Sequence, residues 1–204
     1  MQDIGIFFQV AVLVMSVVIH EVSHGTMALA LGDPTAKLLG RLTLNPVKHI
    51  DPVGSILIPA VMALSNTGFI FGWAKPVPYN PYNLRDQRYG DAKVALAGPL
   101  SNLLIALIFG LMLRFFSGFI PPSAIELIVL IIQMNLVLAI FNLLPIPPLD
   151  GSKVLFGSLP YRYRYYLNIM EQYQIVAILL VVFVIWPLIQ PFISILFKLI
   201  VGIA

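Results

Sequence analysis

The sequence contains no cysteine, and only 10% of its 204 residues are charged. The absence of cysteine excludes disulfide bonds, thiolate metal ligands and cysteine nucleophiles, so any bound metal must be held by histidine and carboxylate side chains. The shortage of charge excludes an ordinary soluble domain, in which about a quarter of the residues are charged. Disorder is excluded as well, because disordered chains are poor in hydrophobic residues and 59% of this chain is hydrophobic.

No block of basic residues is present either. The formal net charge of +3 is spread over several polar segments, which argues against a nucleic-acid partner. The N-terminus is apolar from Ile4 onward but has neither a basic stretch before it nor a small-residue cleavage site after it, so we expect no removable signal peptide. The mean hydropathy of +0.94 instead predicts a polytopic protein embedded in the lipid bilayer of the cell membrane.

Five apolar stretches account for this hydropathy, and each has at least 20 residues, enough for a helix to cross a hydrocarbon core about 30 Å thick. They span residues 4–31, 53–72, 94–118, 123–146 and 172–201. The polar segments between them, 32–52, 73–93 and 147–171, are too short for a second domain, and the sequence has no internal repeat. We therefore expect an all-α fold with a single membrane-embedded domain over residues 1–204.

The distribution of positive charge predicts the topology. Segments 32–52 and 73–93 carry three and four lysine or arginine residues, so both are expected on the cytoplasmic side. Stretch 53–72 between them is too short to cross twice, and it contains glycine and proline residues that suit a lipid-facing span poorly. We interpret it as a re-entrant segment, which leaves a bundle of four transmembrane helices. Five ordinary spans with an imperfect charge bias remain the alternative at this stage.

A short β element is expected near residues 35–48. Gly32-Asp33-Pro34 ends the first helix. Residues 35–44 then alternate between apolar and polar side chains, which is the two-residue period of a strand.

The most specific local motif is His20-Glu21-Val22-Ser23-His24, which reads HExxH inside the first apolar stretch. The i, i+4 spacing puts both imidazoles on one helix face, one turn apart, where they can bind one Zn²⁺. Glu21 flanks the same position, so it can exchange protons with water and with a leaving group. A purely structural role for these side chains is rejected, because ionisable groups at membrane depth are costly and usually functional.

Two histidines leave a zinc site short of the usual three protein ligands, and the third must be His49 or a carboxylate. His49 lies in a polar loop, where an ordinary interfacial histidine is expected. Asp150 is the better candidate, because three prolines between Asn142 and Gly151 interrupt the helix and turn the following carboxylate inward. Gly151 would permit a close approach that a side chain would block. Taken alone, the segment is equally well explained as a turn that leaves the membrane.

HExxH in a first hydrophobic helix, followed by N-x-x-P-x-P-x-L-D-G in a later one, resembles the site-2 protease family of intramembrane zinc metalloproteases. Gly98-Pro99-Leu100-Ser101-Asn102 is also similar to a motif at the start of a middle core helix of that family. The resemblance extends from about Val17 to Lys153. The sequence contains neither a PDZ-like insertion nor a nucleotide-binding (CBS) module, so it resembles a minimal member.

The resemblance implies that His20, His24 and Asp150 hold one Zn²⁺ per chain. It implies that Glu21 is the catalytic acid and base and that Asn142 helps to hold the substrate carbonyl. The implied reaction is hydrolysis of peptide bonds within or next to transmembrane segments of membrane-protein substrates.

A shared zinc ion also constrains the topology. It requires His20 and Asp150 at the same depth, which a re-entrant 53–72 provides and five full crossings do not. About 24 Å of helix precedes the histidines, so the active site is expected toward the cytoplasmic half of the membrane.

Water and substrate must both reach such a site. Ser23, Asn102 and Asn142 are candidates for a polar path, although each is also explained by an interhelical hydrogen bond, which we favour for Ser23. A substrate helix must unwind before it is cut, and an edge strand at residues 35–44 would hold it extended. A hairpin that caps the bundle explains the same residues equally well.

Two other functions are compatible with buried histidines and acids in a membrane. One is a zinc-binding transporter, but transport needs exchangeable sites along a path, whereas one cluster with a general base is present. The other is a membrane protein that binds clients without cleaving them. The intact Glu21 argues against the second function, because a non-cleaving relative has no need of that residue.

Overall fold

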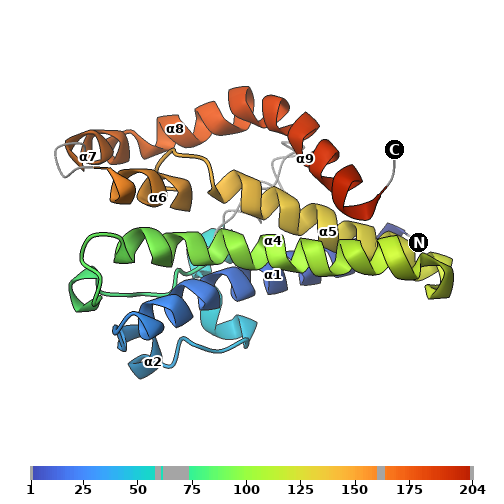
Figure 1. The fold of residues 1–204 in the computed structure, drawn as a ribbon, viewed down its shortest axis with the longest axis horizontal. Coiled ribbons are helices and arrows are strands. Elements are labelled where there is room, and N and C mark those ends of the chain that lie inside the picture. Colours follow the sequence, from blue (N-terminus) through green and yellow to red (C-terminus); the bar gives the residue numbers. More distant parts are fainter. Residues whose placement is uncertain (1, 58–60, 62–73, 160–163, 203–204) are drawn as a thin grey trace.

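The computed structural model describes residues 2–57, 61, 74–159 and 164–202, and within these ranges every regular element is a helix. The three longest are α1 (Gln2–Ala30), α4 (Gly90–Phe116) and α5 (Pro122–Asn142). They run side by side along the long axis of the molecule (Figure 1). The all-α prediction is therefore confirmed for the described part of the chain.

Three helical segments are long and apolar enough to cross a membrane by length and composition, namely Phe7–Ala30, Gly90–Phe119 and Pro122–Asn142. The stretch 172–201 is divided into α8 (Gln174–Leu180), a π-helical segment (Val181–Ile185) and the 16-residue α9 (Trp186–Val201). Pro187 lacks the N–H that would continue the helical ladder, which accounts for the break at this point. Three of the four expected transmembrane helices are thus supported, and the fourth remains a prediction.

Helix α4 lies at the centre of the fold and packs against α1, α5, α9 and α6 (Asp150–Ser158). Alanine and glycine residues dominate its buried face, so the neighbouring backbones approach closely. The main apolar core forms where α5 meets α4 and α9, around Ile132 and Leu136 of α5 and Ile189 and Ile193 of α9. This packing fixes the positions of α1, α4 and α5 relative to one another.

The β element predicted near residues 35–48 was wrong. This range contains the short helix α2 (Thr35–Leu38) and a 3₁₀ helix at Pro46–His49, separated by turns and irregular chain. The Asp33 side chain accepts hydrogen bonds from the backbone and hydroxyl of Thr35, and the Asn45 side chain accepts one from the Val47 backbone. These local bonds between side chain and backbone outweigh the alternating pattern on which the strand was predicted.

The re-entrant interpretation of 53–72 falls mostly outside the described residues. Its described beginning, Pro52–Leu57, is a π-helical segment. The chain on either side of the stretch lies together, since the Lys75 backbone donates to the His49 carbonyl at 2.9 Å. The Arg85 backbone likewise donates to the Leu31 carbonyl, so the chain leaves α1 and enters α4 at the same end of the bundle.

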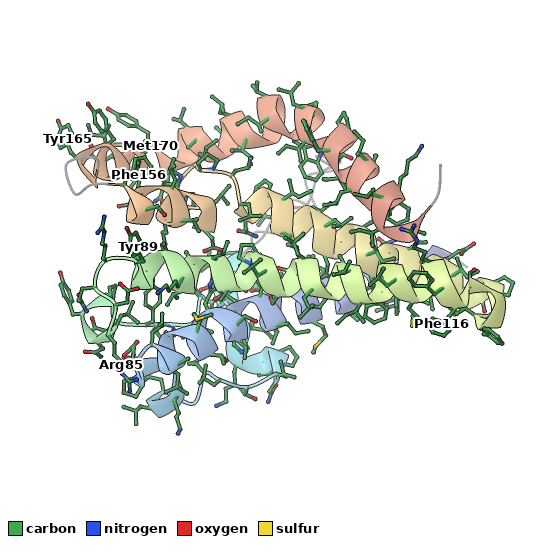
Figure 2. The ribbon with its side chains drawn as sticks, viewed as in Figure 1. Arg85, Tyr89, Phe116, Phe156, Tyr165 and Met170 are labelled. Carbon is green, nitrogen blue, oxygen red and sulfur yellow. The ribbon has the colours of Figure 1, made fainter. Side chains whose placement is uncertain are left out.

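That end is rich in tyrosine and arginine. Arg85 and Tyr89 lie at the same end of the long axis as Tyr165 and Met170 of α7 (Arg164–Gln172), and Phe116 lies at the opposite end (Figure 2). Aromatic and basic side chains of this kind are typical of the membrane–water interface.

Candidate metal centre

The HExxH motif lies in the second half of α1, where both histidines are buried, with 6% of His20 and 8% of His24 exposed. Their Nε2 atoms converge on one oxygen, Oδ2 of Asp150, at 3.0 Å for His20 and 3.2 Å for His24. The structure therefore brings together the three residues that the sequence suggested as metal ligands, although 130 positions separate His20 from Asp150.

The other ring nitrogen of each histidine is engaged elsewhere. Nδ1 of His24 lies 2.7 Å from the Val94 carbonyl oxygen, which can only accept, so we infer that Nδ1 carries the proton. Nδ1 of His20 lies 2.7 Å from Oδ1 of Asn102, whose amide nitrogen donates to other groups. In each neutral imidazole the lone pair is therefore on Nε2, the atom that faces Asp150.

If both imidazoles are neutral, their lone pairs and the carboxylate oxygen repel one another at this separation unless a cation lies between them. If an imidazole is protonated at Nε2, the same distance is a hydrogen bond to Asp150. A tetrahedral zinc site with bonds of about 2.0 Å separates two ligand atoms by about 3.3 Å, close to the distances found here. The potential ligand atoms of His20, Glu21 and His24 also lie within 4.8 Å of one another. The donor set thus fits Zn²⁺ in identity and spacing.

Gly98 of α4 forms the floor beneath the two imidazoles. A Cβ atom at this position would lie 2.4 Å from Nε2 of His24 and 2.6 Å from Nε2 of His20. Any side chain would fill the space in which a shared ion would lie. The sequence placed Gly98 in a family-like motif but did not indicate that its missing side chain makes room for the site.

Asp150 is the first residue of α6, directly after the proline-rich segment that ends α5. A Cβ atom on Gly151 would lie 2.2 Å from the Leu143 carbonyl oxygen and 2.4 Å from that of Leu144. The predicted close approach at Gly151 is therefore confirmed. It lets α6 begin against the end of α5 and directs the Asp150 carboxylate toward α1.

A buried polar network supports His20 from behind. The Asn102 amide donates to Oδ1 of Asn135 at 2.8 Å and to the Ser16 carbonyl at 3.2 Å, and the Asn135 amide donates to the Ser16 hydroxyl at 3.0 Å. Asn102 and Asn135 are fully buried, so the network links α1, α4 and α5. Neither Asn135 nor Ser16 was predicted from the sequence, although an asparagine in the middle of an apolar helix is itself a signal.

Glu21 lies beside an extended segment that we call the strap, residues 74–80. Oε2 of Glu21 accepts a hydrogen bond from the Val77 backbone N–H at 2.8 Å. The Arg41 guanidinium donates to the carbonyls of Lys75 and Pro76 at 2.9 and 3.3 Å. Since Pro76 and Pro78 have no N–H, Val77 contributes the strap's central donor, and that donor points at Glu21.

The strap is also fastened at its far end. Oδ2 of Asp33 accepts from the Asn80 backbone at 2.7 Å, and Oδ1 accepts from the Asn83 side chain at 2.8 Å. The Tyr79 hydroxyl donates to Asp91. Burial and the nearby Asp91 carboxylate raise the pKa of Tyr79 well above its usual range, which keeps this donor protonated. The strap therefore lies in a fixed position beside the HExxH motif.

These groups surround a cavity of about 200 Å³. Its lining includes the HExxH side chains, the strap, Asn142 and the first turn of α6. The Asn142 amide donates to the Leu138 carbonyl of its own helix at 2.9 Å. Lys153 lies over the Tyr79 ring, 5.5 Å from its centroid, at the edge of the same cavity. A small cavity thus adjoins Glu21 and the point where the two imidazoles meet Asp150.

The remaining candidates lie elsewhere. His49 is buried with Nε2 2.9 Å from the Thr43 carbonyl and does not line the cavity. The Ser23 hydroxyl donates to Ile19 within α1, so it makes neither a water path nor the interhelical bond favoured from the sequence. Asn102 makes interhelical hydrogen bonds, and only Asn142 of the three path candidates lines the cavity. The extended chain beside Glu21 is the strap rather than residues 35–44.

Comparison with known proteins identifies relatives along most of the chain. A model of peptidase family M50 matches residues 119–186. The chain is 37% identical to "Putative zinc metalloprotease YwhC" of Bacillus subtilis, over 90% of this chain and 86% of that protein. It is 35% identical to "Putative zinc metalloprotease Rip2" of Mycolicibacterium smegmatis, over 72% of this chain and 56% of that protein. No solved structure matches the chain significantly.

Proposed function

The chain belongs to peptidase family M50, and we propose that it is an intramembrane zinc metalloprotease that hydrolyses peptide bonds within or next to transmembrane segments of membrane proteins. In this proposal residues 1–204 form one metalloprotease domain with one Zn²⁺. Its relatives carry the name zinc metalloprotease, and the helices long enough to cross a membrane suit a membrane-embedded enzyme.

One observation carries the proposal. Nε2 of His20 and Nε2 of His24 converge on Oδ2 of Asp150, while both Nδ1 atoms are hydrogen-bonded elsewhere. This arrangement is stable around a divalent cation and unfavourable without a positive charge. When bound, Zn²⁺ supplies a Lewis acid that polarises the substrate carbonyl and lowers the pKa of water.

Glu21 is the proposed acid and base. Its carboxylate lines the cavity, and the Val77 N–H holds one of its oxygens against the strap. Glu21 accepts a proton from water as the water oxygen bonds to the carbonyl carbon of the scissile peptide. It then returns that proton to the peptide nitrogen as the C–N bond breaks, so the products are a free carboxyl group and a free amine.

Asn142 is the proposed donor to the substrate carbonyl. One N–H of its amide is bonded to Leu138 within α5, which fixes the direction of the side chain and leaves the second N–H for a ligand in the cavity. A donor fixed before the reaction stabilises negative charge on the carbonyl oxygen without reorganisation.

The strap is the proposed guide for the substrate. A helical substrate hides its carbonyls in internal hydrogen bonds, so the segment to be cut must unwind. Pro76, Val77 and Tyr79 of the strap border the cavity in an extended conformation. An unwound segment that lies beside the strap would have its peptide bonds next to Glu21 and Asn142. We propose that this region faces the cytoplasmic half of the membrane.

The Glu21→Gln variant tests the mechanism. Glutamine keeps the shape of the side chain but cannot take the proton, so cleavage of a membrane-embedded single-span substrate should fall by about 10²- to 10⁴-fold. Zinc content, measured by atomic emission on the purified protein, should stay at one ion per chain. Comparison of the membrane proteomes of cells that carry the wild type or this variant would then identify clients as uncut single-span proteins.

Two further variants complete the experiment. Ser23→Ala changes a residue of the same motif whose hydroxyl donates to Ile19 within α1, and it should leave both zinc content and cleavage unchanged. Asp150→Ala should lose zinc and cleavage together, because it removes the charged donor of the site. A Glu21→Gln protein that cleaves at the wild-type rate would refute the role of Glu21, and a full zinc content in Asp150→Ala would remove Asp150 as a ligand.

A further inference from the structure

Helices α5 and α9 enclose a second hollow, which is separate from the catalytic cavity. Its volume is about 350 Å³. We call it the α5–α9 groove and define it by Gln133 and Val137 of α5 together with Gln190, Ser194, Phe197 and Lys198 of α9. None of these residues lines the cavity around the HExxH motif.

Four polar side chains line the groove beside the apolar Val137, Ile193 and Phe197. Gln190, Ser194 and Lys198 follow one another at intervals of four residues, so they form one stripe along α9 that faces Gln133. All four side chains are exposed, and no hydrogen bond or ion pair joins them to the described part of the chain. Gln133 is the twelfth of the 21 residues of α5, which puts its amide at the middle of a helix long enough to span the bilayer.

Exposed amides at that depth are unfavourable in lipid. Hydrocarbon offers no hydrogen-bond partner, and an amide or hydroxyl group left without one costs several kcal/mol. Polar side chains in membrane helices therefore face other helices, where they hydrogen-bond across the contact. A hollow that presents a glutamine from each of two helices is therefore expected to contact another helix rather than lipid.

We propose that the α5–α9 groove binds a transmembrane helix of another membrane protein. The helix carries an uncharged hydrogen-bonding side chain at the level of Gln133 and an acidic side chain at the level of Lys198. The amides of Gln133 and Gln190 supply both donors and acceptors, and the Lys198 ammonium pairs with the acid. This binding surface goes beyond the proposed proteolysis and does not depend on it.

A single helix fits the groove better than a second copy of this chain does. A hollow between two helices is complementary to a convex rod, whereas a second copy would present the same hollow. Two copies in one membrane are related by an axis along the membrane normal, which would also bring Lys198 toward its own equivalent. Like charges at a desolvated contact are unfavourable, so shape and charge both favour the single helix.

The experiment uses the full chain in phosphatidylcholine vesicles, labelled with a fluorophore at one introduced cysteine, Phe119→Cys, outside the groove. Two synthetic leucine-rich transmembrane peptides serve as probes. One is all leucine in its apolar part, and the other carries a central asparagine and one glutamate at the level of Lys198. Energy transfer should show tighter binding of the asparagine–glutamate peptide by about three- to fifteenfold for each hydrogen bond formed.

Variants of the groove decide whether the preference arises there. The double variant Gln133→Leu, Gln190→Leu should bind both peptides equally. Lys198→Glu should lose the preference for glutamate and gain one for a peptide with lysine at that position. Thr26→Val, which changes an exposed threonine bonded within α1, is the matched control and should leave the preference intact. Unchanged thermal unfolding of each variant shows that the fold is retained.

Three outcomes would overturn the proposal. The first is equal affinity of the wild type for both peptides, as expected if only lipid lies against the groove. The second is a preference that survives the double variant. The third is energy transfer between two differently labelled copies of the chain that disappears in the double variant, because a second copy would then be the occupant.

Discussion

At the scale of single residues, the site depends on one residue that has no side chain. The backbone of Gly98 lies against Nε2 of both histidines, the two atoms that would face a bound ion. Even the methyl group of alanine at this position would fill the space in which the ion would lie. The site therefore requires the absence of a Cβ atom at Gly98 as much as it requires the two imidazoles.

We predict that Gly98→Ala abolishes zinc binding. The added methyl group would lie 2.4 Å from Nε2 of His24, closer than any normal contact, so the imidazoles must move apart. Zinc content by atomic emission should fall from one ion per chain to near zero, with cleavage lost in parallel. Gly118→Ala, where nothing lies within 4 Å of the new atom, is the matched control and should keep its zinc. Full zinc content in Gly98→Ala would show that the ion does not lie between the histidines.

We also predict that Asn102→Leu weakens zinc binding without removing a ligand. Leucine removes the acceptor of His20 Nδ1 and leaves Asn135 and Ser16 without a partner on α4. Loss of such a supporting group typically lowers metal affinity by about 10- to 100-fold. Competition with a chelator would measure this change. Asn142→Leu should leave zinc affinity unchanged while lowering the cleavage rate, and the opposite pattern would contradict the roles assigned to the two asparagines.

At the scale of elements, one buried carboxylate fastens the far end of the strap. Asp33 follows the end of α1 and accepts hydrogen bonds from Thr35, Asn80 and Asn83, which connects the helix, the turn after it and the far end of the strap. Burial raises the pKa of Asp33, but these hydrogen bonds outweigh the effect of burial and hold its pKa below the usual range. The ionised form is therefore the one that stabilises the fold.

This pKa shift predicts how stability depends on pH. Because the pKa of Asp33 is lower in the folded state than in the unfolded state, its contribution is complete above the unfolded pKa of about 4 and is lost as pH falls through the folded pKa. Asp33→Asn should therefore lower stability at pH 7 by about 1–3 kcal/mol, since an amide cannot accept the same set of hydrogen bonds. The gap in Tm between the two proteins should close as the pH is lowered below about 4.

The measurement is thermal unfolding in detergent across this pH range. Glu126→Gln, at an exposed carboxylate on α5, is the control and should follow the wild type at every pH. A Tm difference for Asp33→Asn that stays constant down to acid pH would mean that the ionised form of Asp33 does not stabilise the strap.

At the scale of the whole molecule, the two ends of the bundle differ in chemistry. The end that includes the strap, α6 and α7 carries the tyrosine and arginine side chains seen in Figure 2, and the opposite end carries the short connection between α4 and α5. Tyr82 and Phe119 lie at these two ends, and each is 88% exposed. If the active site faces the cytoplasmic half, Tyr82 is inside the cell and Phe119 is outside.

We predict the labelling pattern that follows from this orientation. Because the chain has no cysteine, Tyr82→Cys and Phe119→Cys each introduce a single thiol. A membrane-impermeant maleimide added to whole cells should label Phe119→Cys, and it should label Tyr82→Cys only after permeabilisation. The reverse pattern would invert the orientation, and equal labelling of both in whole cells would contradict an odd number of crossings between them.

Much of this architecture was predictable, and the failures have physical causes. The HExxH spacing identified His20, Glu21 and His24 because i, i+4 neighbours share a helix face whatever the rest of the fold does. The strand predicted at 35–44 failed because alternation is a weak signal that local hydrogen bonds to a side chain, here from Thr35 to Asp33, can overrule. None of the local motifs could indicate the strap either, since the contact of Val77 with Glu21 joins residues 56 positions apart.

The membrane character, the helical class and the chemistry of the donors follow from the amino-acid sequence alone, because each of these depends on composition or on local spacing. Which groups meet depends on how the helices pack. Asp150 reaches both imidazoles because α6 begins against the end of α5, and the Nε2 atoms face it because Val94 and Asn102 hold the other ring nitrogens. Such contacts between distant segments follow from packing, and they cannot be predicted from periodicity along the chain.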